Sequence, residues 1–490
     1  MKTNSLDFDA QALREKILDL AMRGKLIKQD PNDEPASVLL EKIKAEKAKL
    51  VKEKKIKKSK PLPEITDDEK PFDIPDSWEW VHVKDVTTIG NFHSVSPQNI
   101  NQGENLIELA DIESNTGRLL NFEKVTSEVG SNKYQYNQGD VLFAKLRPYL
   151  RKVLIAPNDG ICTTELLPIN GIQTSNIYIY YTFLSSLIFE QIRQEMHGVN
   201  LPRISPKKLA ELIIPLPPLS EQSRIAAKIA QLFALLRKVE TSTQQYTKLQ
   251  TLLKSKVLDL AMRGKLVEQD PHDEPASVLL KKIKAEKEQL IKEGKMKKSK
   301  PLPPITDDEK PFDIPNSWEW VRLGDVITIL RGGSPRPIKK YLTNNSSGIN
   351  WIKIGDSKPN SKYIESATEK IIPEGLNKTR EVHKGDFLLS NSMSFGRPYI
   401  LKINGAVHDG WLVLSEYEQL FDKDYLYYLL SSSFINKQFV ALATGSTVKN
   451  LNRERVANTI AVVPPLLEQK RIAVIIERLS PLLSGVEISL

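Results

Sequence analysis

The sequence predicts an α+β protein with two globular units of mixed strand and helix, separated by long helices and related by an approximate two-fold axis. Three observations lead to this prediction. The chain contains a tandem internal repeat, its near-identical segments have helical spacing of apolar residues, and its divergent segments contain short apolar runs typical of strands.

The repeat defines the organisation of the chain. Residues 13–86 match residues 253–326 at a constant offset of 240, and PPLSEQSRIA at 217–226 matches PPLLEQKRIA at 464–473 at an offset of 247. Similarity nearly vanishes between these frames. We therefore expect a helical region at 1–75, a globular unit at 76–218, a central helical region at 219–315, a second unit at 316–466 and a helix at 467–490.

A long spacer helix is expected from about Ser220 to Met262, where apolar residues alternate in the three-four spacing of a heptad seam. Ser220 is expected to cap this helix and Gly264 to end it. The second copy of the spacer is divided between the two chain ends, so antiparallel packing of the two spacers would bury both seams. Pro481 falls inside the C-terminal part, where we expect a kink or a frayed end.

Two lysine-rich runs, at 37–60 and 277–300, carry net charges of +7 and +6 and account for the whole positive excess of the chain. A thin apolar stripe predicts a helix in each run, broken by KKSKPLP. A solvated lysine face is the favoured interpretation, and phosphate contact or docking of a partner remain alternatives.

The divergent units contain apolar runs that predict strands, such as GDVLFAKL and GDFLLSN, together with a Tyr-rich helix at 176–194 and again at 422–442. A short helix is expected after each Tyr-rich helix. Ser205 and Pro206 open the first of these and Asn452 caps the second.

Composition narrows the functional classes. The chain has no run of 18 apolar residues and no signal-peptide pattern, so we expect a soluble cytoplasmic protein without a membrane partner. The single cysteine, Cys162, excludes an internal disulfide, and the six histidines show no metal-ligand spacing. The tryptophans of SWEWV are expected to be packing anchors, and Glu221-Gln222 and Glu468-Gln469 are expected to serve helix starts.

The repeated motifs resemble a known family. IPDSWEWV and IPNSWEWV open the two units, PPLSEQ and PPLLEQ close them, and LDLAMRGKL occurs twice in the expected order. In these motifs, and over essentially its whole length, the chain resembles the specificity subunits of type I restriction-modification systems. It departs from the family pattern mainly at Pro481.

The resemblance implies two target-recognition domains held apart by helices, with two methyltransferase subunits bound to that frame and restriction subunits joining them. It implies duplex DNA as the ligand and no catalysis by this chain. S-adenosylmethionine, ATP and Mg²⁺ would act through the other subunits, and this chain would bind no cofactor. Two unlike units on one repeated frame are also suited to reading the two halves of an asymmetric bipartite site, whereas identical units would predict a palindrome.

The net charge of the first unit over residues 76–218 is −3, so its overall charge does not indicate a DNA-binding surface. Its candidate DNA contacts are therefore short basic segments, or basic islands, of the sequence. Arginine can bind guanine through two hydrogen bonds, and lysine neutralises phosphate. An ordinary basic loop is the alternative. The candidates are Lys145, Arg147, Tyr149, Arg151 and Lys152 in AKLRPYLRK, and Arg203, Lys207 and Lys208 in NLPRISPKK.

The second unit offers a glycine-containing basic loop, expected to be mobile and to follow a phosphate backbone, and a polar segment at the place of the first unit's island. Structural turn chemistry is the alternative for the polar segment. The candidates are Arg331, Arg336, Lys339 and Lys340 in the loop, Asn391, Ser392, Ser394 and Arg397 in SNSMSFGRP, and Lys449, Asn450, Arg453 and Arg455 near the Arg203 equivalent.

Two other classes of function agree less well with the sequence. A self-contained DNA methyltransferase or nuclease would require a nucleotide-binding or catalytic motif, and the sequence has no GxxxxGK[ST] loop, glycine-rich nucleotide turn, NPPF or DPPY segment. DDEK at 67–70 and 307–310 is better explained as a linker than as a nuclease cluster. A coiled-coil scaffold without DNA affinity would not need two large, divergent globular units.

Overall fold

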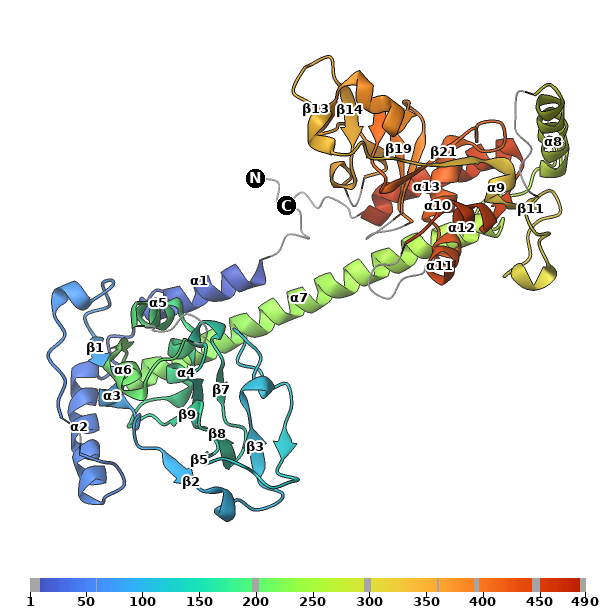
Figure 1. Cartoon of the computed structure of the whole chain (residues 1–490). Helices are drawn as coiled ribbons and strands as arrows, with labels where there is room; N and C mark the ends of the chain where they lie inside the picture. Colours follow the sequence, from blue (N-terminus) through green and yellow to red (C-terminus); the bar gives the residue numbers. More distant parts are fainter. Residues whose placement is uncertain are drawn as a thin grey trace. The chain divides into compact units, whose positions relative to one another are not determined.

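A computed structural model describes residues 9–58, 60–195, 202–294, 301–358, 361–391, 396–442 and 450–484. The chain divides into two compact units, residues 1–243 and 244–490. One continuous helix, α7 (Leu219–Met262), crosses the boundary between them and is the long green helix of Figure 1. Strands and helices mix in both units, which confirms the predicted α+β class.

The described residues of the first unit form three small sheets. A two-stranded sheet pairs β1 with β10, where the repeat frame enters and leaves the unit. The other two have the strand orders β2-β5-β8-β3-β4 and β7-β6-β9. Their bounds are β1 (Glu79–His82), β2 (His93–Val95), β3 (Asn105–Ile107), β4 (Glu123–Lys124), β5 (Lys133–Tyr136), β6 (Val141–Ala144), β7 (Val153–Ile155), β8 (Gly160–Thr163), β9 (Leu166–Ile169) and β10 (Ile213–Leu216).

The core of the first unit lies between the three-stranded sheet and its helices. All four residues of β6 and of β9 are buried, so both faces of these strands are packed against other elements. This explains why their sequences are continuous apolar runs. Phe143 of β6 packs against Phe183 with ring centroids 5.2 Å apart. This arrangement fixes the end of β6, from which the first basic loop leaves.

The Tyr-rich segments form two helices each, rather than the single helix that the sequence predicts. α4 (Asn176–Leu184) is followed by α5 (Ser186–Glu195), and α10 (Lys423–Ser431) is followed by α11 (Ser433–Leu442). Ser185 and Ser432 separate the pairs with extended backbones, and their hydroxyls donate to the carbonyls of Thr182 and Leu429. These local hydrogen bonds compete with continuation of the helix.

The second unit repeats the plan with different strands. β11 pairs with β22 as β1 does with β10, and two five-stranded sheets have the orders β12-β21-β18-β19-β15 and β13-β16-β14-β20-β17. The bounds are β11 (Glu319–Arg322), β12 (Thr328–Arg331), β13 (Leu342–Thr343), β14 (Ile349–Ile352), β15 (Tyr363–Ile364), β16 (Glu369–Ile371), β17 (Arg380–Val382), β18 (Phe387–Ser390), β19 (Pro398–Leu401), β20 (Gly405–Val407), β21 (Trp411–Ser415) and β22 (Ile460–Val463).

The repeated frame supplies further helices around both units. They are α1 (Ala10–Met22), α2 (Ala36–Lys52), α3 (Val83–Val86) and α6 (Pro206–Glu211) in the first unit, and α8 (Ala276–Lys292), α9 (Leu323–Val326), α12 (Arg453–Asn458) and α13 (Leu466–Ser484) in the second. Ser205 caps α6 and Asn452 caps α12, as predicted. Short 3₁₀ turns complete both units.

The lysine-rich runs form α2 and α8, with an apolar stripe that faces the unit. Leu39 and Ile43 of α2 are buried, while most of its lysines are exposed. Lys47 is the exception, because its ammonium donates 2.5 Å to the carbonyl of Lys84 and desolvation lowers its pKa. Lys287 repeats this contact with Asp325 at 2.6 Å. One lysine of each run therefore attaches the helix to the globular unit.

The spacer helix has the predicted length, and Gly264 ends it with a φ of +65°. The expected cap was wrong. Helix α7 begins one residue before Ser220, whose hydroxyl instead donates 2.6 Å to Asp33. At the other end of the chain, α13 continues through Pro481 to Ser484.

Within the first unit, α1 runs antiparallel to α7. Arg14 of α1 forms an ion pair with Glu240, whereas Asp33, which follows α1, pairs with Arg224 at 3.1 Å. Residues later in the first segment therefore contact residues earlier in α7, as antiparallel packing requires. The seam is buried near the start of α7, where Ile229 is inaccessible, but its middle is open, since Val239 is 44% exposed. Within the described segments, no helix is long and apolar enough to cross a membrane.

Candidate nucleic-acid interface

In the first unit, two basic segments that lie far apart in sequence are joined through their backbones. Leu146, in the loop after β6, forms an antiparallel bridge with Arg203. Ile204 donates 3.0 Å to the carbonyl of Lys145, and Arg147 donates 2.9 Å to that of Pro202. The structure thus assembles the two predicted islands of this unit into one basic surface.

Arg147 stands beside a short 3₁₀ turn with its side chain exposed. Arg147 and Arg151 flank the short 3₁₀ turn Pro148–Leu150, and both adopt left-handed conformations, with φ of 49° and 46°. Such values are unfavourable for residues with a Cβ and cluster at functional sites. Arg147 is exposed and its guanidinium forms no hydrogen bond or ion pair with any residue that the structure describes, while Tyr149 is 42% exposed. Both can meet a ligand from solvent.

Two members of this island are turned into the fold. Arg151 forms a 3.1 Å ion pair with Glu15 of α1 and lies over the ring of Phe189 at 4.8 Å, leaving 12% of its side chain exposed. Lys152 donates 2.6 Å to the carbonyl of Leu109. These contacts show Arg151 and Lys152 holding the loop against its own unit, so they are weaker candidates for DNA than the sequence suggested.

A carboxylate lies between the remaining basic groups. Glu165 approaches Lys145 at 4.0 Å and Arg203 at 3.4 Å, and Arg203 keeps about half of its side chain exposed. At the start of α6, Lys207 is exposed and Lys208 pairs with Glu211 at 3.3 Å. Phosphate binding by this cluster would compete with the carboxylate.

A shallow groove of about 600 Å³ adjoins Lys145, and sequence reasoning missed it. The rings of Phe92 and Tyr134 lie in its wall with centroids 5.1 Å apart, accompanied by serine and threonine hydroxyls. Pairing of β2 with β5 brings the two rings together. No sequence signal joins residues so far apart, since only the sheet register makes them neighbours.

The second unit repeats the backbone junction with different side chains. Leu451 donates 2.8 Å to the carbonyl of Asn391, as Ile204 does to Lys145. The side chain of Asn391 is not available as predicted, because it is 7% exposed and its amide donates 2.8 Å to the carbonyl of Asp409. Its role is to hold two loops together.

The other residues of this junction fall into two groups. Ser392, Ser394 and Lys449 lie outside the described residues. Arg397, Asn450 and Arg453 are exposed, whereas Arg455 donates 3.1 Å to the carbonyl of Asn450 and is half-buried. Among the residues of this junction that the structure describes, the accessible cations are therefore Arg397 and Arg453.

The glycine loop after β12 is anchored rather than mobile. Gly332 donates 2.9 Å to the carbonyl of Trp411, and Gly333 donates 3.2 Å to that of Val407. A Cβ at Gly332 would lie 2.2 Å from the carbonyl oxygen of His408, so glycine permits this close approach. The end of β12 and the loop after it present four exposed cations without side-chain partners among the described residues: Arg331, Arg336, Lys339 and Lys340.

The paired Glu-Gln motifs build the junction between unit and spacer. Glu221 lies in the first turn of α7, is 1% exposed, and accepts 2.9 Å from the indole of Trp78; burial raises the pKa of this carboxyl. Gln222 accepts 2.9 Å from the backbone of Ser175 and donates 3.0 Å to the carbonyl of Pro217. In the described part of the chain, no three His, Cys, Asp or Glu side chains gather as metal ligands.

Comparisons with known proteins agree with this architecture. The family model "Type I restriction modification DNA specificity domain" matches twice, at residues 75–249 and 315–486. The type I restriction enzyme EcoAI specificity subunit of Escherichia coli is 39% identical over 66% of this chain and 64% of its own length. The EcoEI specificity subunit of the same species is 35% identical over 79% of this chain and 73% of its own length.

Solved structures share the fold. The HsdS subunit of Thermoanaerobacter tengcongensis has a TM-score of 0.51 at 21% identity and covers 85% of this chain and 92% of its own. A chain from a structure on complex assembly and conformational transition of the type I R-M system has a TM-score of 0.59 at 22% identity, covering 84% and 93%. With two specificity domains on a duplicated helical frame, the chain belongs to the family of type I restriction-modification specificity subunits.

Proposed function

We propose that this chain is the DNA-reading subunit of a type I restriction-modification complex, with each unit reading one half of an asymmetric bipartite site. One observation carries the proposal. In both units the same backbone hydrogen bond joins the same two loops, Ile204 to Lys145 and Leu451 to Asn391, yet the side chains presented around it differ. A constant support with unlike contact residues is what two unlike half-sites require.

Base contacts would come from the exposed members of each surface. Arg147 and Tyr149 stand at the tip of the first unit's loop, and Arg397 and Arg331 are accessible in the second. Arginine pairs with guanine in the major groove through two hydrogen bonds. Lys207, Lys339 and Lys340 would neutralise phosphates and position the duplex.

The chemistry of the complex would reside in other subunits. We propose that two methyltransferase subunits and the restriction subunits bind the helical frame in the cytoplasm and bring S-adenosylmethionine, ATP and Mg²⁺. The exposed basic side chains of both units support a binding role. The alternatives remain a self-contained methyltransferase or nuclease and a scaffold without DNA affinity.

Methylome sequencing tests the proposal directly. The chain is expressed with its methyltransferase partner in a host lacking other methyltransferases, and the modified sites are mapped at single-molecule resolution. We expect two unlike short blocks separated by a fixed unspecified gap. A continuous or palindromic site would contradict the proposal, and so would methyl transfer by the purified chain alone.

A further inference from the structure

A cavity of about 930 Å³ opens in the first unit, away from the basic loops. Its walls come from α1, α5, α6, β1 and the segment before β1. Acidic side chains dominate it: Asp19, Glu64, Asp68, Glu69, Glu190 and Glu211. Arg23 and Lys208 are the permanently charged cations in its lining, and both are already paired, with Asp19 at 2.7 Å and Glu211 at 3.3 Å.

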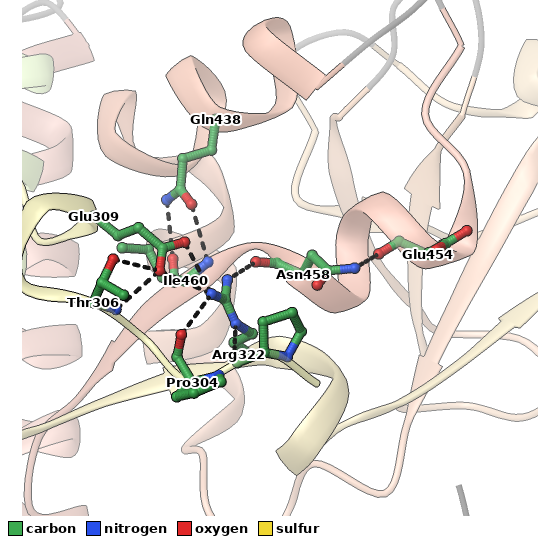
Figure 2. A network of polar contacts seen from close by, with 9 residues as sticks. Pro304, Thr306, Glu309, Arg322, Gln438, Glu454, Asn458 and Ile460 are labelled. Atoms are coloured by element: carbon green, nitrogen blue, oxygen red, sulfur yellow. Dashed lines mark hydrogen bonds and ion pairs between the residues drawn. The ribbon is translucent and has the colours of Figure 1, made fainter. Parts of the chain in front are cut away.

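The second repeat shows what the equivalent position holds. There Arg322 is 6% exposed, and its guanidinium donates to the carbonyls of Pro303 at 2.6 Å and Asn458 at 2.8 Å. It also forms two 2.9 Å hydrogen bonds to the carboxylate of Glu309. Figure 2 shows this guanidinium enclosed between the segment before β11 and the end of α12. The chain thus contains its own example of a cation bound in this frame.

The first repeat keeps the acceptors and lacks the guanidinium. By the repeat offsets, Pro63, Glu69 and Glu211 correspond to Pro303, Glu309 and Asn458, and His82 stands where Arg322 does. The ring of His82 contacts the carbonyls of Glu211 at 2.8 Å and Pro63 at 3.2 Å. A neutral imidazole can donate only one of these hydrogen bonds. Among the described residues, the carboxylate of Glu69 accepts hydrogen bonds from Thr66 alone and forms no ion pair with a lysine or arginine, and only the imidazole of His82 lowers its pKa as a neighbouring charge.

Other substitutions make the first cavity more acidic than the equivalent place in the second repeat and give it a smaller apolar side chain. Glu190 is replaced by Lys437 and Glu64 by Pro304, so the second repeat loses negative charge. Leu187 is replaced by Phe434, whose ring packs against Phe312 at 5.2 Å and Trp320 at 5.7 Å. The smaller leucine leaves room beside Phe72 for the apolar stem of a long side chain.

We propose that this cavity is a docking site for an arginine side chain presented by a partner protein. Arg322 indicates the chemistry, because a planar guanidinium satisfies a carboxylate and several carbonyls at once. The volume exceeds that of one side chain, so it also accommodates flanking backbone of the partner. Nucleic acid is a poor occupant, because the acidic lining repels phosphate.

A capped peptide tests the recognition without DNA or partner subunits. Saturation-transfer NMR measures binding of acetyl-Gly-Arg-Gly-amide to the full chain, with the same peptide containing neutral citrulline as the control. We expect saturable binding of the arginine peptide and binding of the citrulline peptide that is weaker by about tenfold or more. Equal binding of the two peptides, no binding of the arginine peptide, or equally strong binding of spermidine would overturn the proposal.

Two variants test whether the peptide binds in this cavity. His82→Arg introduces the second repeat's own cation and should abolish peptide binding in a chain that melts cooperatively. Glu69→Gln should weaken binding of the arginine peptide by about tenfold. The matched Glu309→Gln should leave peptide binding unchanged, because Arg322 occupies that position. Equal effects of Glu69→Gln and Glu309→Gln, or unchanged binding by folded His82→Arg, would contradict the site. Since the readout is peptide binding, it can fail while DNA reading by the chain stands.

Discussion

The indole nitrogen of Trp78 donates a 2.9 Å hydrogen bond to the buried carboxylate of Glu221, and Trp318 and Glu468 repeat this bond at the same length. In each unit the contact joins the residue before the first strand to the first turn of the helix that leaves the unit. The direction in which each unit meets its helix is therefore set by residues of the repeated frame. The divergent loops can change without moving that junction.

Substitution of Arg147 should affect one half-site only. Its exposed side chain stands on the loop that Leu146 joins to Arg203, within the first unit. If Arg147 contacts a guanine with two hydrogen bonds, Arg147→Ala should weaken the free energy of DNA binding by about 1–3 kcal/mol and relax the sequence preference at one base position. Binding to duplexes with single base changes, measured at several salt concentrations, tests this prediction.

The controls distinguish base reading from phosphate contact. Arg331→Ala should change only the other half-site, and Lys207→Ala should weaken all sequences alike and reduce the salt slope by about one. If Arg147→Ala behaves like the lysine variant, the arginine contacts phosphate. An effect of Arg147→Ala on both half-sites would contradict the division of labour between the units.

Insertions in α7 should change the gap between the half-sites. Each helical residue adds about 1.5 Å and rotates the remainder of the helix by about 100°. Four residues after Thr243 add about 6 Å and nearly preserve the helical phase, so we expect a gap longer by one or two base pairs with both half-sites unchanged. Two residues place the second unit on the opposite face and should abolish methylation.

Methylome sequencing of both insertion variants provides the measurement. An unchanged gap in an active four-residue variant would show that partner subunits, rather than α7, set the distance. Full activity of the two-residue variant would show that the phase of this helix does not matter.

Replacing Glu221 with glutamine should stabilise the chain at neutral pH. Burial raises the pKa of the Glu221 carboxyl, so the folded state binds a proton more tightly than the unfolded state. Stability is therefore lost as pH rises from the ordinary glutamate range through the raised pKa. Glutamine retains an oxygen for Trp78 without the buried charge. Thermal melting should show that Glu221→Gln raises the melting temperature most above neutral pH and least near pH 4.

Glu468→Gln is the matched variant in the second unit, where burial likewise raises the pKa of the carboxyl. It should show the same pH dependence. Trp78→Phe should instead destabilise the chain at all pH values, because it removes the indole donor from the buried carboxyl group of Glu221 in either protonation state. A pH-independent gain from both glutamine variants would contradict the electrostatic explanation.

Adding one methyl group at Gly332 should disrupt the second unit's basic loop. A Cβ there would lie 2.2 Å from the carbonyl oxygen of His408, and neither group can move without breaking the hydrogen bonds of the loop. We expect Gly332→Ala to lower the free energy of unfolding by about 1–3 kcal/mol. Gly355→Ala is the control, because nothing lies within 4 Å of its added Cβ. Urea unfolding compares the two, and equal stability would show that the loop is not anchored.

The sequence by itself determined the frame of this protein. The repeat separated two units from their helices, the periodicity placed α7 within one residue of its observed start, and Gly264 marked its end. Caps at Ser205 and Asn452 were also predictable. Helical hydrogen bonds and caps join residues three or four positions apart, so a short window of sequence contains both partners.

Only the tertiary structure decided which candidate side chains face solvent. Arg147 and Arg151 are four residues apart and chemically identical, yet Glu15 and Phe189 hold the second while the first is exposed. Asn391 became a buried link, and the Phe92–Tyr134 groove had no sequence signal. Each outcome depends on pairing between segments tens of residues apart, and no local preference encodes that pairing because it is set by strand register and core packing.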